Sequence, residues 1–449
     1  MNFAGIGLQL PSLLLPQPGI DLTTWAVVAC DQYTSQPDYW AQVDALVGAA
    51  PSTLRLTLPE VYLGAPDEAA RVAAIQDTMH RYLAEGVLVA HPPGLVRVER
   101  ETARGRIRKG LIVALDLECY DFNTGAKTLI RPTEGTIVER LPPRIRVREG
   151  APLELPHVMV LIDDPGRTVI EPLFAEPLEP LYDVALMLNS GRVRGGRIEH
   201  PMLLQWVVEQ LARLAEPAAF AARYGVGHDE PVLLYALGDG NHSFATAKII
   251  WEKLKRSAAD PVAIMRHPAR HALVELVNLH DEGLEFEAIH RIAFGVDPAA
   301  LLAALTAFFQ AQGSALTVLE YPSWAMARQA WQDLQRAPGR QVMAFAAQQR
   351  YGVLTLGQPR LSLPVAGLQA FLDEYLPGQP GARLDYIHGE DTLLQLSAQP
   401  GNLGFYLPAL AKDDFFRTVI LDGALPRKTF SMGEAHDKRF YLESRRITL

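Results

Sequence analysis

Residues 239–243, DGNHS, combine side chains and backbone features that suit phosphate chemistry. Gly240 permits a tight turn and close approach of a ligand, and the free N–H groups of a first helical turn attract an anion. Asp239 has the chemistry to hold a divalent cation or accept a hydroxyl proton, and His242 to donate to a phosphoryl oxygen or act as an acid or base. The pattern is equally typical of an ordinary helix start, in which Asp239 or Asn241 caps the helix.

Charged residues in two other stretches are candidates for the rest of such a site. Glu134 stands in a turn-rich segment with Arg131 and Arg140, and burial can bring a carboxylate toward the neutral pKa of a general base. Residues 425–435 place Lys428 among hydroxyls beside a glycine, and cations of this kind neutralise a transferring phosphoryl group. The alternatives are surface ion pairs in the first stretch and a solvated basic turn in the second.

Other chemical signatures are weaker. His267 and His271 are four residues apart, a spacing at which one helix face can present two metal ligands, but Pro268 lies between them. Dispersed histidines are more often structural. The sequence contains no GxxxxGK[ST] or GxSxG motif, and the glycines at 191–196 do not follow a convincing strand pattern. NAD-dependent chemistry and a serine hydrolase are therefore disfavoured.

Hydrophobic periodicity indicates alternating strands and helices around these residues. The pattern predicts strands at 107–117, 158–162, 232–237, 341–345 and 353–356, and helices at 69–84, 244–254, 301–309 and 325–334. Residues 129–156 are rich in arginine, proline and glycine without a clear period, which predicts an extended loop. The expected fold class is mixed α/β. The expected organisation is a main domain over 1–296, a smaller α/β subdomain over 297–380 and a segment over 381–449 that returns to the site.

Composition restricts the class of partner. The chain has 449 residues with 49% hydrophobic and 21% charged residues, enough to bury a large core. A formal net charge of −9 disfavours a nucleic-acid-binding face, which needs clustered Lys and Arg. Two cysteines, no run of about 18 apolar residues and no export signal predict a soluble cytoplasmic protein without a membrane span. A small phosphorylated molecule is the expected ligand.

Longer segments carry a resemblance to known families. The string DGNHSFATAK resembles a motif of the ParB/sulfiredoxin superfamily, which includes a free serine kinase. More extensively, the chain resembles the bacterial family filed as domain of unknown function 1015. The segments that carry this resemblance are CDQYTSQPDYW, RPTEGTIVERLPPRIRVREGAPLELPHVMVLIDD, HPARHALVELVNLHDEGLEFEAIHR and LPRKTFSMGEAHDKRFYLESRRI, in addition to DGNHSFATAK.

The resemblance implies a ParB/sulfiredoxin-like core with large insertions and a nucleotide or phosphate site at Asp239, Gly240 and His242. Glu134 is the general base that similarity to the kinase implies. The sequence departs from the commoner motif at Asn241, where a second His often stands, and at Ser243, where Arg often stands. Without that Arg the turn lacks a planar bidentate phosphate donor. A cation elsewhere in the chain must then supply the charge.

These observations predict a phosphotransferase-like enzyme that acts on a small phosphorylated metabolite or a free amino acid. The most specific form of this prediction is that the substrate is serine or phosphoserine. Mg²⁺ and a nucleotide or pyrophosphate donor are the expected cofactors. The alternatives are a metal-dependent phosphatase and a non-catalytic nucleotide-binding regulatory protein. The expected catalytic residues are Glu134, Asp239 and His242, with Asp239 also as metal ligand, and the expected phosphate- or nucleotide-binding residues are Arg131, Arg140, Gly240, Asn241, Ser243 and Lys428.

Overall fold

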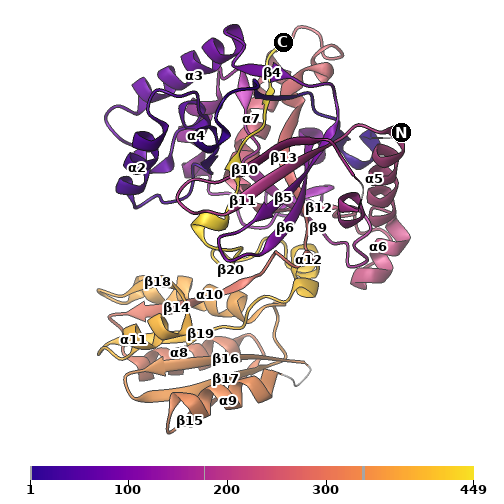
Figure 1. Ribbon diagram of the computed structural model, residues 1–449. Coiled ribbons are helices and arrows are strands. Elements are labelled where there is room, and N and C mark those ends of the chain that lie inside the picture. The colour runs from indigo at the N-terminus through magenta and orange to yellow at the C-terminus, as the bar shows by residue number, and fades with distance from the viewer. Residues whose placement is uncertain (1–2, 176, 336–338) are drawn as a thin grey trace. The chain divides into compact units, whose positions relative to one another are not determined.

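A computed structural model describes residues 3–175, 177–335 and 339–449 of the chain. The chain forms two compact units, the first comprising Met1–Leu284 and Gly433–Leu449 and the second Glu285–Met432 (Figure 1). The sequence pattern placed boundaries at 296 and 380, whereas the units divide at 284 and 432. The second unit is thus an insertion in the first, and the chain's last segment returns to unit 1.

Unit 1 is built on a mixed sheet with the strand order β10-β11-β5-β6-β13-β9-β12-β7, with β1 paired to β6. A smaller sheet has the order β4-β2-β22-β8, and β21 pairs with β3. The strands are β1 (Leu8–Gln9), β2 (Leu13–Pro16), β3 (Val27–Val28), β4 (Leu88–Ala90), β5 (Leu95–Glu101), β6 (Ile107–Asp116), β7 (Ile130–Pro132), β8 (Leu153–Glu154), β9 (Val158–Ile162), β10 (Pro180–Ala185), β11 (Arg192–Ile198), β12 (Tyr235–Asp239), β13 (His271–Asn278), β21 (Phe440–Tyr441) and β22 (Ser444–Arg446).

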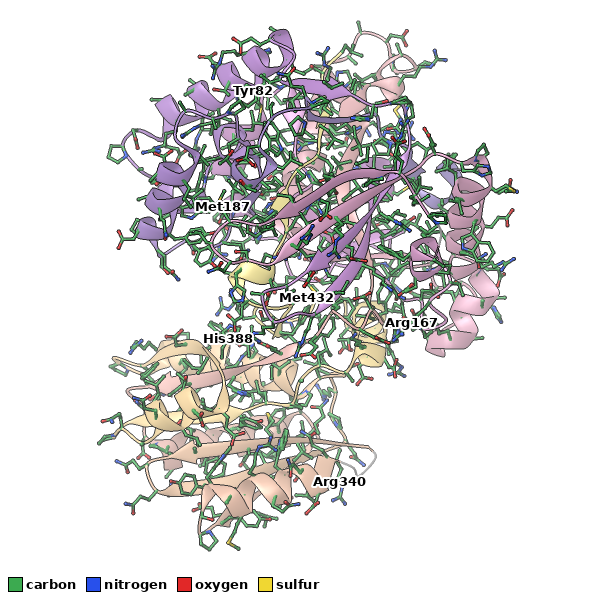
Figure 2. The ribbon with its side chains drawn as sticks, viewed as in Figure 1. Tyr82, Arg167, Met187, Arg340, His388 and Met432 are labelled. Carbon is green, nitrogen blue, oxygen red and sulfur yellow. The ribbon has the colours of Figure 1, made fainter. Side chains whose placement is uncertain are left out.

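Helices cover both faces of the main sheet (Figure 1). They are α1 (Leu22–Trp25), α2 (Pro37–Val47), α3 (Glu68–Ala84), α4 (Leu141–Arg148), α5 (Pro201–Leu214), α6 (Pro217–Tyr224) and α7 (Asn241–Ser257). Side chains alternate between faces along a strand, so Leu111 and Val113 of β6 pack in the core with α5 and α7, while Ile112 packs with α2 and α3. Tyr82 and Met187 belong to the same core cluster as Ile112 (Figure 2). The central strands are apolar because both faces are covered.

The predicted strands over 107–117 and 158–162 and the predicted helix over 69–84 are confirmed by β6, β9 and α3. The strand predicted over 232–237 is β12, which begins at Tyr235 and extends to Asp239. The extended loop predicted over 129–156 is wrong, because that stretch contains β7, α4 and β8. Two prolines occupy the first turn of α4, where no intrahelical N–H bond is lost, and its arginines pair with carboxylates of neighbouring elements.

Unit 2 contains helices and a second sheet, which has the strand order β15-β17-β16-β19-β14-β18, with β20 paired to β14. Its helices and strands confirm the two helices and two strands predicted for the smaller subdomain. They are β14 (Glu287–Phe294), α8 (Pro298–Ala311), β15 (Ala315–Tyr321), α9 (Trp324–Gln335), β16 (Arg340–Ala347), β17 (Arg350–Gly357), α10 (Pro364–Tyr375), β18 (Arg383–His388), α11 (Glu390–Ser397), β19 (Asn402–Tyr406), α12 (Lys412–Leu421) and β20 (Phe430–Ser431). The fold class is mixed α/β. Within the described residues, no helix has the length and apolar character that crossing a membrane requires.

Candidate functional site

The turn between β12 and α7 is the centre of the candidate site. Gly240 adopts a left-handed backbone conformation with φ of 80°, and a Cβ atom there would lie 3.1 Å from the Cα atom of Val158. Among the described residues no side chain caps the start of α7, whereas Glu216 and Asp297 cap α6 and α8. The turn therefore needs glycine, and the first-turn N–H groups of α7 are available to a ligand.

The segment after β7 contacts this turn through two backbone N–H groups. The Thr133 N–H donates to the Oδ1 atom of Asn241 at 3.1 Å, and the Ile137 N–H donates to the Nε2 atom of His242 at 3.2 Å. The parallel pairing of β7 with β12 sets this register. Glu134, which is half-buried, lies in the chain between these two contacts. The structure thus brings the predicted general base into the segment that contacts the predicted phosphate turn.

His242 is a neutral hydrogen-bond donor at this position. Burial, followed by the charges of Arg144 and Arg140, lowers the pKa of His242 to about 4. Because Nε2 accepts from Ile137, the ring proton resides on Nδ1. Near neutral pH the imidazole is therefore uncharged, and its Nδ1–H is a hydrogen-bond donor.

Asp239 is paired with a lysine of the C-terminal segment. The Nζ atom of Lys438 lies 3.1 Å from Oδ2 of Asp239, and the Gly240 N–H donates to Oδ1 at 2.9 Å. Arg100, a buried residue, holds this segment by donating to the carbonyl of His436 at 2.7 Å. Lys438 therefore supplies a fixed positive charge beside the turn.

A chain of polar contacts links the segment after β3 with His157 and β21. The Nδ1 atom of His157 lies 2.6 Å from the Tyr441 hydroxyl, which donates to the Sγ atom of Cys30 at 3.5 Å. The Nε2 atom of His157 lies 3.5 Å from Oδ2 of Asp31. Burial disfavours the charged imidazole, but the Tyr441 oxygen and then the Asp31 carboxylate outweigh it and raise the pKa of His157 well above its ordinary value. His157 thus favours its protonated form, and its Cδ2 atom lies 3.2 Å from where a Gly240 Cβ would stand.

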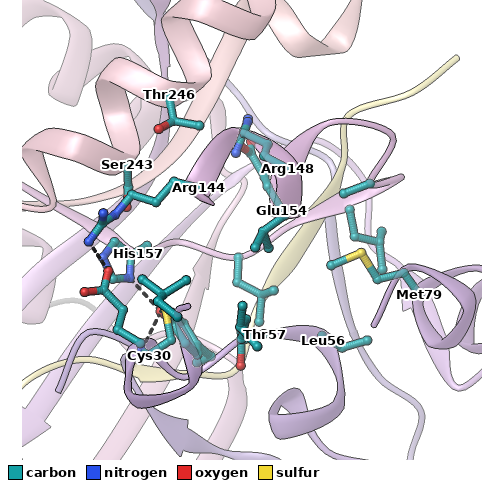
Figure 3. A pocket seen from close by; sticks show the side chains of 18 residues that line it. Cys30, Leu56, Thr57, Met79, Arg144, Arg148, Glu154, His157, Ser243 and Thr246 are labelled. Atoms are coloured by element: carbon teal, nitrogen blue, oxygen red, sulfur yellow. Dashed lines mark hydrogen bonds and ion pairs between the residues drawn. The ribbon is translucent and has the colours of Figure 1, made fainter. Parts of the chain in front are cut away.

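A cavity of about 150 Å³ opens beside the first turn of α7 (Figure 3). Arg144 donates to Glu60 within it, and Arg148 donates to Glu154 at 2.6 Å. Burial raises the pKa of Glu60 despite the opposing charge of Arg144. Its other lining residues are Cys30, Leu56, Thr57, Leu58, Leu63, Met79, Val147, Ala151, Leu153, Leu155, His157, Ser243, Thr246 and Tyr441. The predicted binding residue Ser243 thus faces a cavity.

The remaining predicted residues have different settings. The buried Arg131 guanidinium donates to the carbonyls of Thr128 and Pro231, at 3.0 and 2.5 Å, so it holds the start of β12. Arg140 is exposed, and its positive charge contributes to the lowered pKa of His242. Lys428 belongs to unit 2, where its carbonyl accepts from Arg291 at 2.8 Å. Its assignment as a phosphate ligand stays a prediction.

The expected divalent cation has no preformed protein site in the described ranges. No three His, Cys, Asp or Glu side chains there converge as metal ligands. The Asp239 carboxylate already pairs with Lys438, whose ammonium competes with a metal ion. Mg²⁺ commonly binds through one or two carboxylates and the phosphates of a substrate. These residues therefore do not fit a resident Mg²⁺ ion, and we derive no chemical step through one.

The chain belongs to a family described as "Protein of unknown function (DUF1015)", which matches residues 14–375. Solved structures that it resembles include a free serine kinase variant in complex with AMP, at 12% identity and a TM-score of 0.39 over 75% of this chain and 92% of that one. A conserved hypothetical protein from Pyrococcus furiosus matches at 13% identity and a TM-score of 0.35, over 75% of this chain and 95% of that one. Truncated SbnI from Staphylococcus aureus matches at 11% identity and a TM-score of 0.33, over 72% and 83%. No curated protein matches the chain.

Several residues of the site were not among those predicted. Asp31 and Cys30 come from CDQYTSQPDYW, His157 directly follows the arginine-rich stretch 129–156, and Lys438 and Tyr441 come from the final segment. Each lies in a stretch on which the family resemblance rests. Polar residues within such stretches were the available signal, although nothing in their spacing along the chain indicated that they meet.

Proposed function

We propose that unit 1 is a phosphotransferase-like enzyme whose phosphate site is the start of α7. The observation that carries the proposal is that an uncapped helix start after a left-handed glycine lies among cationic side chains. Lys438 lies 3.1 Å from Asp239, and Arg140 and Arg144 influence the charge of His242. Helix N-terminal N–H groups and cations together favour a phosphate group.

Each side chain at the turn then has a chemical role. The N–H groups of Asn241 and Ser243 bind phosphoryl oxygens, and the Nδ1–H of His242 donates to the same group. Lys438 and Arg140 stabilise the charge of the transferring group, which is spread over its equatorial oxygens. These roles use the positions that the sequence predicted and replace the missing motif arginine with cations from other segments.

The proposed reaction transfers a phosphoryl group from a nucleoside triphosphate or pyrophosphate to a hydroxyl of a small metabolite or free amino acid, with serine as the first acceptor to test. The acceptor oxygen forms the new P–O bond while the bridging P–O bond of the donor breaks, leaving its electron pair on the departing phosphate. Glu134 takes the hydroxyl proton. Mg²⁺ would arrive bound to the donor phosphates rather than occupy a resident site.

The experiment compares Lys438→Ala with Lys253→Ala, a matched lysine of α7 that also pairs with a carboxylate but lies at the surface. Thermal unfolding is measured with ATP, ADP, pyrophosphate, serine and phosphoserine, with and without Mg²⁺. Ligands that bind the native state raise its melting temperature. We expect ATP or pyrophosphate to stabilise the wild type and Lys253→Ala but not Lys438→Ala.

Turnover measurements then separate the classes of function. Acceptor-dependent release of ADP or phosphate supports the proposal, and its loss in Glu134→Gln with retained binding supports the role of Glu134. Phosphate release that needs a divalent ion but neither nucleotide nor acceptor indicates a phosphatase. Binding without turnover indicates a regulatory nucleotide-binding protein. If no phosphate compound stabilises the wild type, the phosphate site is wrongly assigned.

A further inference from the structure

The cavity beside α7 is lined by polar and apolar side chains, with the Arg148–Glu154 ion pair between Ser243 and Met79 in Figure 3. In Figure 3, Ser243, Arg144, His157 and Cys30 lie toward one side, and Met79 lies toward the other. Met79 and most of the leucines of the lining are themselves buried, at 1–5% exposure for Leu56, Leu58, Met79 and Leu153. The apolar wall is therefore part of the fold and not a chance exposed patch.

The charged residues of the lining already have partners of opposite charge, including Asp31 for His157. Arg144 donates to Glu60, and Glu154 accepts from Arg148 and from Arg445, at 2.6 and 2.5 Å. Glu154 also accepts from the backbone N–H of Leu273. A ligand within the cavity thus meets paired charges and apolar carbon, and it does not need to neutralise an isolated charge.

Ser243 connects this cavity with the proposed phosphate site. Its side chain lines the cavity, whereas its backbone N–H belongs to the uncapped first turn of α7. Thr246, one turn further along the helix, also lines the cavity. A molecule with a phosphate or hydroxyl at the turn would consequently extend its body toward Met79 and the leucines.

We propose that the substrate of this site is amphipathic: a phosphate or hydroxyl group joined to a compact apolar body of about six carbon atoms, such as an aromatic ring or a branched chain. The inference rests on the proposed function, because the turn places the polar end. An apolar cavity near 150 Å³ accommodates about one benzene molecule, and this cavity measures about 150 Å³. Free serine carries one side-chain carbon and would leave the apolar wall uncovered.

The test measures dissociation constants by calorimetry for pyrophosphate, methyl phosphate, phosphoserine and benzyl phosphate. Burial of the ring predicts that benzyl phosphate binds about 10- to 100-fold more tightly than methyl phosphate. Met79→Ala enlarges the apolar end, so we expect it to shift the preference toward 2-naphthylmethyl phosphate. Met343→Ala removes an equally buried methionine from unit 2 and is the matched control, with the wild-type preference expected. Ala151→Leu, which fills the cavity, should abolish the benzyl preference while pyrophosphate still binds.

The outcomes separate this inference from the proposed function. If pyrophosphate and methyl phosphate bind but benzyl phosphate binds no more tightly, the amphipathic substrate is refuted and the phosphate site stands. If phosphoserine binds more tightly than benzyl phosphate, the inference is likewise overturned. If benzyl alcohol binds in a manner sensitive to Ala151→Leu but no phosphate compound binds, the cavity retains its apolar preference and the phosphotransferase proposal fails.

Discussion

Replacing His157 by glutamine should remove a pH dependence of stability that the wild-type protein has. The imidazole is 14% exposed and contacts the Tyr441 hydroxyl and the Asp31 carboxylate. Those oxygens, acting against burial, raise the pKa of His157 well above its ordinary value. Glutamine keeps a donor for the Tyr441 hydroxyl but cannot titrate. The difference between the two proteins therefore isolates the proton on His157.

The size of the effect follows from proton linkage. In the unfolded chain histidine has a pKa of about 6.5, so between that pH and the higher folded pKa the folded state binds one more proton. The free energy of unfolding then falls by about 1.4 kcal/mol for each unit by which the pH rises. The contribution is fully present below about pH 6.5 and is lost as the pH rises through the folded pKa. Asp31, whose pKa is lowered, contributes equally throughout this range, since its own contribution is lost only in acid.

Urea unfolding at pH 7 and pH 8 measures this difference. We expect the wild type to lose about 1.4 kcal/mol more than His157→Gln over that one unit. His228→Gln, which removes an exposed histidine of the same unit, should keep the wild-type dependence. Equal pH slopes for wild type and His157→Gln would refute the reasoning, because they would mean that the folded protein does not hold the extra proton.

Three further substitutions test the construction of the site. Gly240→Ala should lower the free energy of unfolding by at least about 1–2 kcal/mol in urea titrations, because alanine is strained at this left-handed position. Wild-type stability of this variant would contradict the tight turn. Lys438→Met should leave the Asp239 carboxylate unpaired and weaken pyrophosphate binding at least about tenfold by calorimetry; unchanged affinity would remove Lys438 from the phosphate site. Glu154→Gln should destabilise unit 1 by about 3–5 kcal/mol in the same titrations, because Arg445 stays buried without its anionic partner. A loss of stability below about 1 kcal/mol would show that Arg445 finds another partner.

Local sequence pattern was sufficient for elements whose own side chains determine their form. The five apolar residues of β9 predicted a buried strand, and the spacing of apolar residues predicted α3. Helix α4 was missed because its sequence is arginine- and proline-rich. Its arginines pair with Glu60 and Glu68, which lie far from it in the sequence, and with Glu154 of the following strand, so its helical form could not be inferred from periodicity.

The candidate site divides in the same way. Gly240 and His242 lie in one short motif; the structure confirms the tight turn at Gly240, whereas the role of His242 stays a prediction. Lys438 is 199 residues from the carboxylate that it contacts, and Tyr441 is 284 residues from His157. Such contacts depend on the pairing of β21 with β3 and on the order of strands in the main sheet, which no local pattern specifies. The sequence therefore pointed to Lys428, ten positions earlier in the same segment.

The insertion of unit 2 within unit 1 has a consequence for biosynthesis. Because a ribosome adds residues in order, all of Glu285–Met432 is made before Lys438 and Tyr441 exist. During translation, the first 284 residues thus hold Asp239 without its ammonium partner and Val27 without the strand that pairs with it. At about 5–20 residues per second, this interval lasts about 7–30 seconds. A nascent chain consequently carries an incomplete site, and the charge of Asp239 stays unpaired with Lys438 until residue 438 has been added.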